Sequence, residues 1–486
     1  MIDRIDRHQP AQPLSRATRP AVWLQSLLFG LCLIVLSTDL SSAQDSQDSS
    51  VAPLPSSDRL LTLDTAIRTG LTTHPSVTQA RYQTLIAGAL TKQARGDQYP
   101  WLEASIAESN GALRIVTTDG KAVHDRGGHG FDPGGALAKH NQNMVSGGLL
   151  LNQLITDFGY TAHRIAASES AEAASEKAIL TNKAYVILTV QKAYLSCLLQ
   201  QHLVAIAAET VRRRKTIRDQ ISSLYKNQLR SKVDLDLIQV EVSNAELALI
   251  KAQNDVHQAF AALNNAMGLK RPDHYPLEDQ SVVVSPSPDI ESLVTLGLNN
   301  RPELLGGRDQ VVASEELLRA AKALNFGSIT AVGSVGMTKY GTVHDGGIPS
   351  DGVAPFWGIG ATAKIPIFTG FRIQNQIKEA GSHKGESEAE LQNLANEVLL
   401  QIVRAYLART TNAEQITLER DRVAFSQEAL KLAQERYRLG LSPIVEVVRA
   451  TTGLFEAESR LKEAQYIYKT SEAAIAYATG QDYKRF

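Results

Sequence analysis

The feature that most constrains this chain is a run of 108 residues, from Tyr160 to Met267, that contains neither glycine nor proline. Because these two residues are the strongest breakers of helices, so long a run predicts long, continuous α-helices. A helix from about Tyr160 to Gln228 would be on the order of 100 Å long at 1.5 Å per residue. That length exceeds a globular domain and suits a rod or the wall of a tunnel.

Apolar residues in the second part of this run recur at alternating steps of four and three, the spacing of a coiled-coil seam. The same spacing returns near the C-terminus, and small residues at many seam positions allow helices to approach closely. The seam positions are Ile238, Val242, Ala245, Leu249, Ala252, Val256, Ala259, Leu263 and Ala266, and then Ala450, Leu454, Ala457, Leu461, Ala464, Tyr468, Ser471, Ile475 and Ala478.

The chain also repeats itself at nearly constant offsets, which predicts an internal tandem duplication. The segment Gly70–Pro75 matches Gly297–Pro302 at an offset of 227, and Ala193–Leu195 matches Ala405–Leu407 at an offset of 212. The fall in the offset between these blocks places extra residues in the middle of the first copy. The two copies are therefore expected to be similar in fold but unequal in detail.

The N-terminus is typical of a secretory signal peptide. Four arginines precede an apolar stretch from Ala21 to Leu36, and Ser41-Ser42-Ala43 offers a cleavage site before Gln44. The alternative is a retained membrane anchor. The expected organisation is a signal peptide at 1–43, a flexible leader at 44–60, a first helix–strand–strand–helix repeat at 61–270, a proline-rich linker at 271–289, a second repeat at 290–480 and a C-terminal tail at 481–486.

Each repeat is expected to place two strands between helices. In the second copy, apolar and polar or small residues alternate over 329–337 and 357–365, with a loop at 341–354. The first-copy strands are less clear and are placed near 101–117 and 144–152, around a long Gly/His/Asp-rich loop. Strands of about ten residues with one apolar face suit a membrane barrel. Trp101 and Trp357 are then either part of an interfacial aromatic girdle or ordinary core aromatics.

Four strands are too few to close a barrel, and open sheet edges are not tolerated in lipid. The chain must therefore oligomerise if its strands enter a membrane. The predicted fold class is a mixed α and β membrane protein, in which a long α-helical coiled-coil barrel continues into a transmembrane β-barrel. Each chain gives four strands to that barrel.

Signals for turns lie near the middle of each helical stretch. Gly440 is suited to ending one helix and Pro443 to beginning the next, while Ser231 is a plausible N-cap in the first copy. Earlier in each copy, Pro75 and Pro302 interrupt a predicted helix near its start. Each copy is expected to form a long helical hairpin, and the tips comprise Gln228, Leu229 and Arg230 in the first and Gly440, Leu441 and Ser442 in the second.

Over nearly its whole mature length the chain resembles the TolC family of outer-membrane efflux proteins. The segments that carry the resemblance are Leu61–Pro75, Pro366–Arg372 and Glu435–Gly440, the last running on to Gly480. The resemblance implies a homotrimer with a 12-stranded barrel in the outer membrane and a helical tunnel crossing the periplasm. It also implies a periplasmic adaptor protein that docks at the hairpin tips and an inner-membrane pump that supplies the energy. The channel would then need no catalytic chemistry and no cofactor.

The resemblance also indicates a gate at the periplasmic mouth. Tyr437 and Glu446 match a family tyrosine and carboxylate, and Asp234 matches the first-copy carboxylate. The chain departs from the family at Ser442, where an arginine is often used, and at Arg449, where a second carboxylate would be. We hypothesise that Asp234 and Glu446 line the mouth and that Arg449 forms an ion pair there. The alternative is solvated coiled-coil surface charge.

Other features favour ordinary structural roles. The basic run Arg212–Lys215 is interpreted as a solvated helix face, because the chain has a net charge of −1 and no basic field for nucleic acid. His124, His129 and His140 lack clear metal-ligand spacing, and Cys197 fits packed apolar surface.

Three functions remain open at this point. The first is a passive export channel for small molecules in a tripartite efflux system. The second is the same conduit used for type I protein secretion. The third is a secreted coiled-coil structural or adhesin protein, against which the paired strands in both copies argue.

Overall fold

The computed structural model describes residues 60–113, 140–270, 273–343 and 352–486. The predicted signal peptide, nearly all of the predicted leader, and His124 and His129 lie outside these residues. The first half contains α2 Leu63–Thr73, α3 Pro75–Gly96, β1 Trp101–Leu113, β2 His140–Thr156, α4 Tyr160–Lys226 and α5 Lys232–Ala266; the second contains α6 Ile290–Asn300, α7 Pro302–Ala323, β3 Ser328–Val343, β4 Gly352–Lys364, α8 Arg372–Arg438 and α9 Ile444–Ala478, followed by a 3₁₀ helix, Asp482–Lys484.

Corresponding helices of the two halves have equal lengths. The four helices of each half contain 11, 22, 67 and 35 residues in chain order. The 67-residue α4 begins at the predicted residue and ends two residues before the predicted end, because nothing in its sequence interrupts the helical hydrogen bonds. Ser231 caps α5 as expected, since its side chain accepts a hydrogen bond from the Asp234 amide at 3.2 Å.

The prolines near the start of each half divide a predicted single helix into two. His74 is extended (φ −70°, ψ 126°), and Pro75 is the first residue of α3. Arg301 and Pro302 repeat this arrangement before α7. A residue before proline disfavours the helical conformation, so the chain turns there and the proline then fits the first helical turn.

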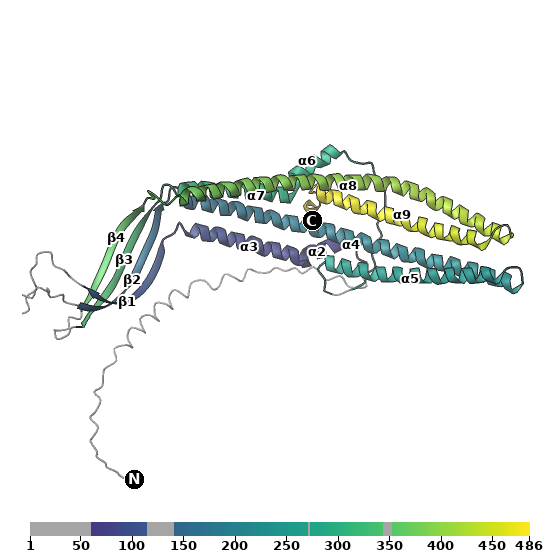
Figure 1. Cartoon of the computed structure of the whole chain (residues 1–486), viewed down its shortest axis with the longest axis horizontal. Helices are drawn as coiled ribbons and strands as arrows, with labels where there is room; N and C mark the ends of the chain where they lie inside the picture. The colour runs from purple at the N-terminus through teal and green to yellow at the C-terminus, as the bar shows by residue number, and fades with distance from the viewer. Residues whose placement is uncertain (1–59, 114–139, 271–272, 344–351) are drawn as a thin grey trace, which may run out of the picture. The chain divides into compact units, whose positions relative to one another are not determined.

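The helices form two successive layers, one next to the strands and one toward the hairpin tips, which we call the tip layer. Helices α4 and α8 run through both layers. Next to the strands, α3 packs on α4, α4 on α7 and α7 on α8 (Figure 1). Toward the hairpin tips, α5 packs on α4, α4 on α9 and α9 on α8. Helices α4 and α9 are therefore central in the tip layer, while α5 and α8 are its two edges.

The four strands form one antiparallel sheet in the order β1-β2-β3-β4. β2 is longer than the sequence predicted because it pairs with both β1 and β3, and this pairing holds Gly147 and Gly148 in the ladder. β3 likewise extends to Val343 and β4 begins at Gly352, so the predicted loop between them is shorter than expected.

The register gives the sheet an apolar face and a more polar face, on which Leu150, Leu154 and Val332 also lie. Ser105, Ser334 and Thr362 lie on the polar face, where Phe356 covers Gly336 and Gly148. Residues opposite one another in the ladder share a face. The apolar face carries Leu102, Ile106, Val145, Leu149, Leu151, Ile329, Val335, Met337, Trp357 and Ile359.

The two tryptophans of the expected girdle lie on opposite faces. Trp101 pairs with Asn152 and so belongs to the polar face, whereas Trp357 pairs with Val335 on the apolar face. Their exposed fractions are 61% and 80%, so neither is a core aromatic in this chain. Only Trp357 remains a candidate for a lipid-facing girdle.

The largest core lies where the linker crosses the helices. The hydroxyl of Tyr194, a fully buried residue of α4, donates to the carbonyl oxygens of Leu61 and Glu278 at 2.8 and 2.9 Å. Phe486 packs against this core, so the C-terminal tail belongs to the folded structure. Among the described residues, no helix is both long and apolar enough to cross a membrane.

Candidate gate at the hairpin tips

The two hairpin tips have the same backbone geometry despite different sequences. Gln228 and Gly440 stand 212 residues apart and both adopt the left-handed conformation, with φ of 62° and 79°. The next amide in each tip donates back to the carbonyl five residues earlier, Leu229 to Leu224 at 2.9 Å and Leu441 to Arg436 at 2.8 Å. The first tip therefore forms the turn that the sequence indicated only for the second, with glutamine in the place of glycine.

Three side chains from both hairpins meet at the tips. The Tyr437 hydroxyl donates to Asp234 Oδ2 at 3.3 Å, and the Arg230 guanidinium lies 4.5 Å from the centre of the Tyr437 ring. Arg230 also donates to the Tyr437 carbonyl oxygen. These contacts join α5 and the first tip to the end of α8, so they hold the two hairpins together.

Tyr437 lies in an environment that keeps its hydroxyl protonated. Its side chain is buried, and burial together with the Asp234 carboxylate raises its pKa to about 12, although Arg230 opposes this shift. The phenol is therefore a permanent hydrogen-bond donor at neutral pH. Movement of the helices can break this contact, whereas ionisation of the Tyr437 hydroxyl does not do so at neutral pH.

The arginine of this contact is missing from the second tip and present in the first. Arg230 stands 212 residues before Ser442, the position at which the family resemblance calls for an arginine. Ser442 is buried, and its hydroxyl has no hydrogen-bond partner among the described residues. The sequence prediction assigned Arg230 to the tip surface for adaptor docking, and the constant offset that aligns it with Ser442 was a signal for its additional contact with Tyr437.

The sequence predicted that Glu446 lines the mouth and that Arg449 forms an ion pair there. Glu446 is half-buried and its carboxylate lies 3.8 Å from Arg436 on α8. Arg449 is exposed, and no carboxylate of the described chain lies within ion-pairing distance of it. The two residues are one helical turn apart on α9, and within one chain only Glu446 is paired.

The remaining tip residues are open to solvent. Leu229 and Leu441 have exposed fractions of 67% and 68%, and Gln228 and Gly440 are also exposed. Exposed leucines at both tips are apolar surface that the chain itself does not cover. The structure thus separates the tips into buried contact residues and outward-facing ones.

The basic run on α4 is only in part the solvated face that the sequence predicted, since Arg212 is exposed and pairs with Glu209 on the same helix. Arg214 is buried and its guanidinium contacts Glu241 on α5 and Thr452 on α9. Arg213 pairs with Glu458 on α9, and Lys215 pairs with Glu246 on α5 at 2.7 Å. The interpretation was wrong for Arg213 and Arg214, because their partners on α5 and α9 come from helices distant in sequence.

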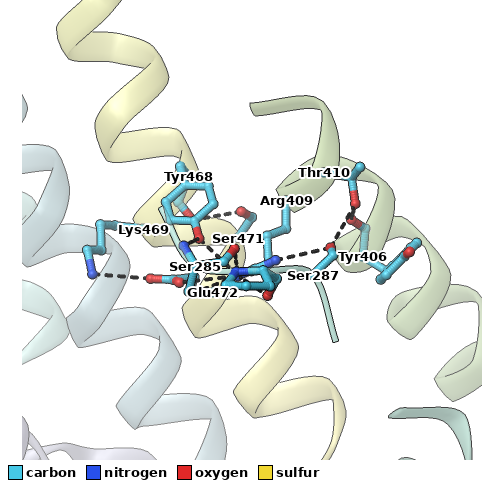
Figure 2. Close-up of polar contacts among 10 residues, drawn as sticks. Ser285, Ser287, Tyr406, Arg409, Thr410, Tyr468, Lys469, Ser471 and Glu472 are labelled. Atoms are coloured by element: carbon cyan, nitrogen blue, oxygen red, sulfur yellow. Dashed lines mark hydrogen bonds and ion pairs between the residues drawn. The ribbon is translucent and has the colours of Figure 1, made fainter. Parts of the chain in front are cut away.

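A second buried arginine fixes the linker and also escaped the sequence prediction. Arg409 on α8 donates to the Ser285 carbonyl oxygen at 2.9 Å, to Ser287 Oγ at 3.1 Å and to the Tyr468 hydroxyl at 2.9 Å (Figure 2). Its counterpart at an offset of 212 is Cys197, which is buried in the apolar core as predicted. The available signal was that an arginine in the second half corresponds, at the offset of 212, to an apolar position in the first half. This difference indicates polar contacts that the first half lacks.

Catalytic or metal-binding groupings are not evident in the described part of the chain. No group of three or more His, Cys, Asp or Glu side chains there is arranged to hold a metal ion. Of the three histidines weighed from the sequence, His140 is the first residue of β2. The polar contacts described above connect helices to one another and to the linker.

Comparison with known proteins agrees with this architecture. A model of the outer membrane efflux protein family matches residues 66–269 and 293–481. The chain belongs to this family. The predicted resemblance to TolC is confirmed, since outer membrane protein TolC of Escherichia coli is 21% identical over 354 residues, covering 70% of each chain.

Other relatives and solved structures point the same way. The toluene efflux pump outer membrane protein TtgF of Pseudomonas putida is 25% identical over 296 residues, which are 61% of this chain. The matched region spans about three fifths of the length of that relative. The outer membrane protein VceC of Vibrio cholerae has the same fold, with a TM-score of 0.71, 18% identity, and coverage of 86% of this chain and 96% of that one.

Membership of this family implies a location in the outer membrane. It also sets aside the secreted coiled-coil adhesin that the sequence had left open, because family members are efflux channels of that membrane.

Proposed function

We propose that the chain is one subunit of a trimeric channel that exports small molecules across the periplasm and the outer membrane as part of a tripartite system. The observation that carries the proposal is a pair of apolar stripes on the two edges of the tip layer. Neither stripe has a partner within the described chain, and both repeat every seven residues.

The two stripes match each other when counted from the tips. Val233, Val240 and Leu247 follow the edge helix α5, with exposed fractions of 65%, 57% and 65%. The other edge carries exposed Leu418, Phe425 and Leu432 on α8 and Leu439 directly after its end. Val240 is eight residues past the start of α5 and Leu432 six before the end of α8, so the two lie at similar heights when hairpin tips are level.

A second copy of the chain is the occupant that fits both edges. One edge of a copy would pack on the opposite edge of the next, with heptad positions interlocking as in a coiled coil. Such a head-to-tail contact forms a closed ring when the rotation closes. Exposed Leu85, Leu90, Leu400 and Leu407 extend the apolar edges along α3 and α8 in the layer near the strands.

The sheet supports the same assembly. β1 and β4 are edge strands with no further partner in the described chain, and one face of the sheet is apolar. Three copies would supply twelve strands, enough to close a barrel with the apolar face and Trp357 toward lipid. The equal helix lengths of the two halves, which support the tandem duplication, would give the tunnel approximate sixfold symmetry.

The tips then form the periplasmic mouth. In a ring, the contact of Arg230, Tyr437 and Asp234 would hold each second hairpin against the first and keep the mouth narrow. Exposed Leu229 and Leu441 would be available to a periplasmic adaptor, which couples the channel to an inner-membrane pump. Arg449, unpaired within the described chain, would face a carboxylate of the neighbouring copy.

Small molecules are the proposed cargo because relatives are named for pumps of toluene and of antibiotics. The test is the susceptibility of cells that lack the protein to antibiotics and aromatic solvents. We expect susceptibility to rise on deletion, to return to normal with the wild-type chain, and to stay high with Val240→Glu, which breaks the subunit contact. Unchanged susceptibility together with loss of a secreted protein from the medium would instead favour protein secretion.

A further inference from the structure

The two hairpins of one chain contact each other in successive zones along α4. At the tip lies the contact of Arg230 with Tyr437. Next comes an apolar zone in which Ile221 and Ile238 of the first hairpin pack with Ile444 and Val447 of the second. Beyond this zone, about 18 Å from the end of α4, lies the buried Arg214.

Arg214 is anchored on its own hairpin and reaches to the other. Its Nη1 lies 2.9 Å from Glu241 Oε2 and donates to the Glu241 carbonyl oxygen at 2.8 Å, both on α5. Its Nη2 donates to Thr452 Oγ1 on α9 at 3.0 Å. The neighbouring Arg213 pairs with Glu458 on α9 at 3.3 Å. Two consecutive arginines of α4 thus hold α9 against it.

The contact between the hairpins is interrupted next to this point. A cavity of about 360 Å³ lies between α4, α5 and α9 on the side of Arg214 away from the tip. Three alanines contribute to its wall, and their short side chains leave space between the hairpins there. The residues lining it are Ala207, Thr210, Arg214, Glu241, Asn244, Ala245, Ala248, Thr452, Phe455 and Glu456.

We propose that Arg213 and Arg214, with Thr452 and Glu458 as their partners on α9, form a second lock that limits how far the hairpins part when the tip contact is released. The inference rests on the proposed channel function. Between the tip and the arginines the hairpins are packed, and a cavity follows directly beyond Arg214. The hairpins pack again only farther along, where Tyr466 of α9 joins the core of α4 and α5. Breaking the tip contact alone therefore frees the tip zone, while the arginines still hold α9 beside the cavity.

The α9 side of this lock can be changed without damaging the fold, because the arginines on α4 keep other carboxylate partners. Arg214 stays paired with Glu241 and Arg213 with Glu209 when the α9 partners are removed. Thr452→Val combined with Glu458→Ala deletes only the contacts between hairpins. No buried arginine then loses its carboxylate, which is the change that usually destabilises a protein most.

The experiment measures the open probability of single channels of the full-length protein in planar lipid bilayers. Tyr437→Phe weakens the tip contact by removing the hydrogen bond to Asp234, Thr452→Val/Glu458→Ala releases the lock, and a third variant carries all three changes. We expect a partial increase from the tip variant and little change from the lock variant alone. The combined variant should exceed the product of the two separate effects by at least about threefold, as expected for coupled contacts.

The matched control changes the same residue types on the same helix away from the cavity and the lock. Thr470→Val/Glu463→Ala removes a hydrogen bond within α9 and an exposed carboxylate of the same helix. Combined with Tyr437→Phe, it should leave the open probability of the tip variant unchanged. An equal increase in the control would overturn the lock, because general loosening of α9 would then suffice.

Two further outcomes separate the possible failures. If the tip variant opens the channel and the lock variant adds nothing beyond a simple product, the lock is absent while the channel stands. If neither wild type nor any variant conducts, the proposed function itself fails. Should the double change prevent assembly of the oligomer, the isosteric Thr452→Val alone is tested with Tyr437→Phe, with a smaller excess expected and none if the lock does not exist.

Discussion

The buried acid Asp482, near the C-terminal end, makes the stability of the folded chain depend on pH. Asp482 is buried at 3% exposure with one oxygen that has no hydrogen-bond partner in the described chain. Burial raises the pKa of its carboxyl, although Arg485 opposes the shift. The folded state therefore prefers the protonated acid, and its stability falls as the pH rises from the unfolded pKa through the raised folded value.

Asp482→Asn is accordingly expected to stabilise the protein at neutral pH by about 1 kcal/mol, because a charged, incompletely bonded group is removed. The gain should shrink at pH 3, below the ordinary pKa of an aspartate, where the carboxyl is largely protonated in both states. The apparent melting temperature in detergent at the two pH values checks this. Asp279→Asn is the control with the opposite sign, since bonds from Tyr466 and His202 outweigh burial and lower the pKa of Asp279.

The acidic residues of the tips should set ion selectivity. Asp234 and Glu446 are the carboxylates that the sequence predicted at the mouth, and a negative constriction favours cations. Asp234→Asn/Glu446→Gln should reduce the cation-to-anion permeability ratio roughly twofold, read from the reversal potential in a salt gradient. Asp219→Asn, which changes an exposed carboxylate on α4 instead, should leave the ratio unaltered. If the paired change also leaves the ratio unaltered, these carboxylates are surface charge.

The sequence predicted those residues of the hairpin tips that belong to a family motif or recur at the offset of the duplication. Tyr437 and Asp234 were expected together at the mouth and do meet. The roles of Arg214 and Arg409 were missed because their partners lie on other helices or in the linker. A charged residue in a helical sequence looks the same whether its distant partner exists or not.

At the scale of elements, the turns show how one backbone shape is reached with unequal residues. Gln228 adopts a left-handed conformation that costs an L-residue about 1–2 kcal/mol, while Gly440 adopts it freely. Gln228→Gly should therefore stabilise the first hairpin, by about 0.5–1 kcal/mol after the added freedom of the unfolded chain. Gly440→Ala should destabilise the second by a similar amount. Chemical denaturation followed by circular dichroism measures the free energy of unfolding of both variants. Changes of the same sign in the two variants would contradict the inferred turns.

The accuracy of the element predictions followed the strength of local signals. The helices α4 and α8 were expected because long stretches lack proline, and the paired caps fixed where the hairpins turn. β2 was predicted too short because its glycines and asparagines have weak strand preference. Pairing with strands on both sides, which no local pattern reports, extends it.

For the whole molecule, assembly is expected to depend on the two apolar edges. Val240→Glu or Leu432→Glu places a charge in the proposed contact between copies and should yield folded monomers with unchanged helix content. Val283→Glu, an exposed change on the linker, should leave the oligomer intact. Native mass spectrometry reads the number of chains. Because Val240 and Leu432 lie at similar heights, Val240→Glu with Leu432→Arg should restore the oligomer, and failure to do so would contradict the proposed register.

The central claim is that copies of this chain enclose a gated conduit. Conductance of the purified protein in planar lipid bilayers tests it most directly. The account predicts discrete conductance steps from the wild-type oligomer and a higher open probability for Tyr437→Phe, in which the bond to Asp234 is lost. A correctly assembled oligomer that gives no conductance above the bare bilayer, with or without Tyr437→Phe, would contradict it.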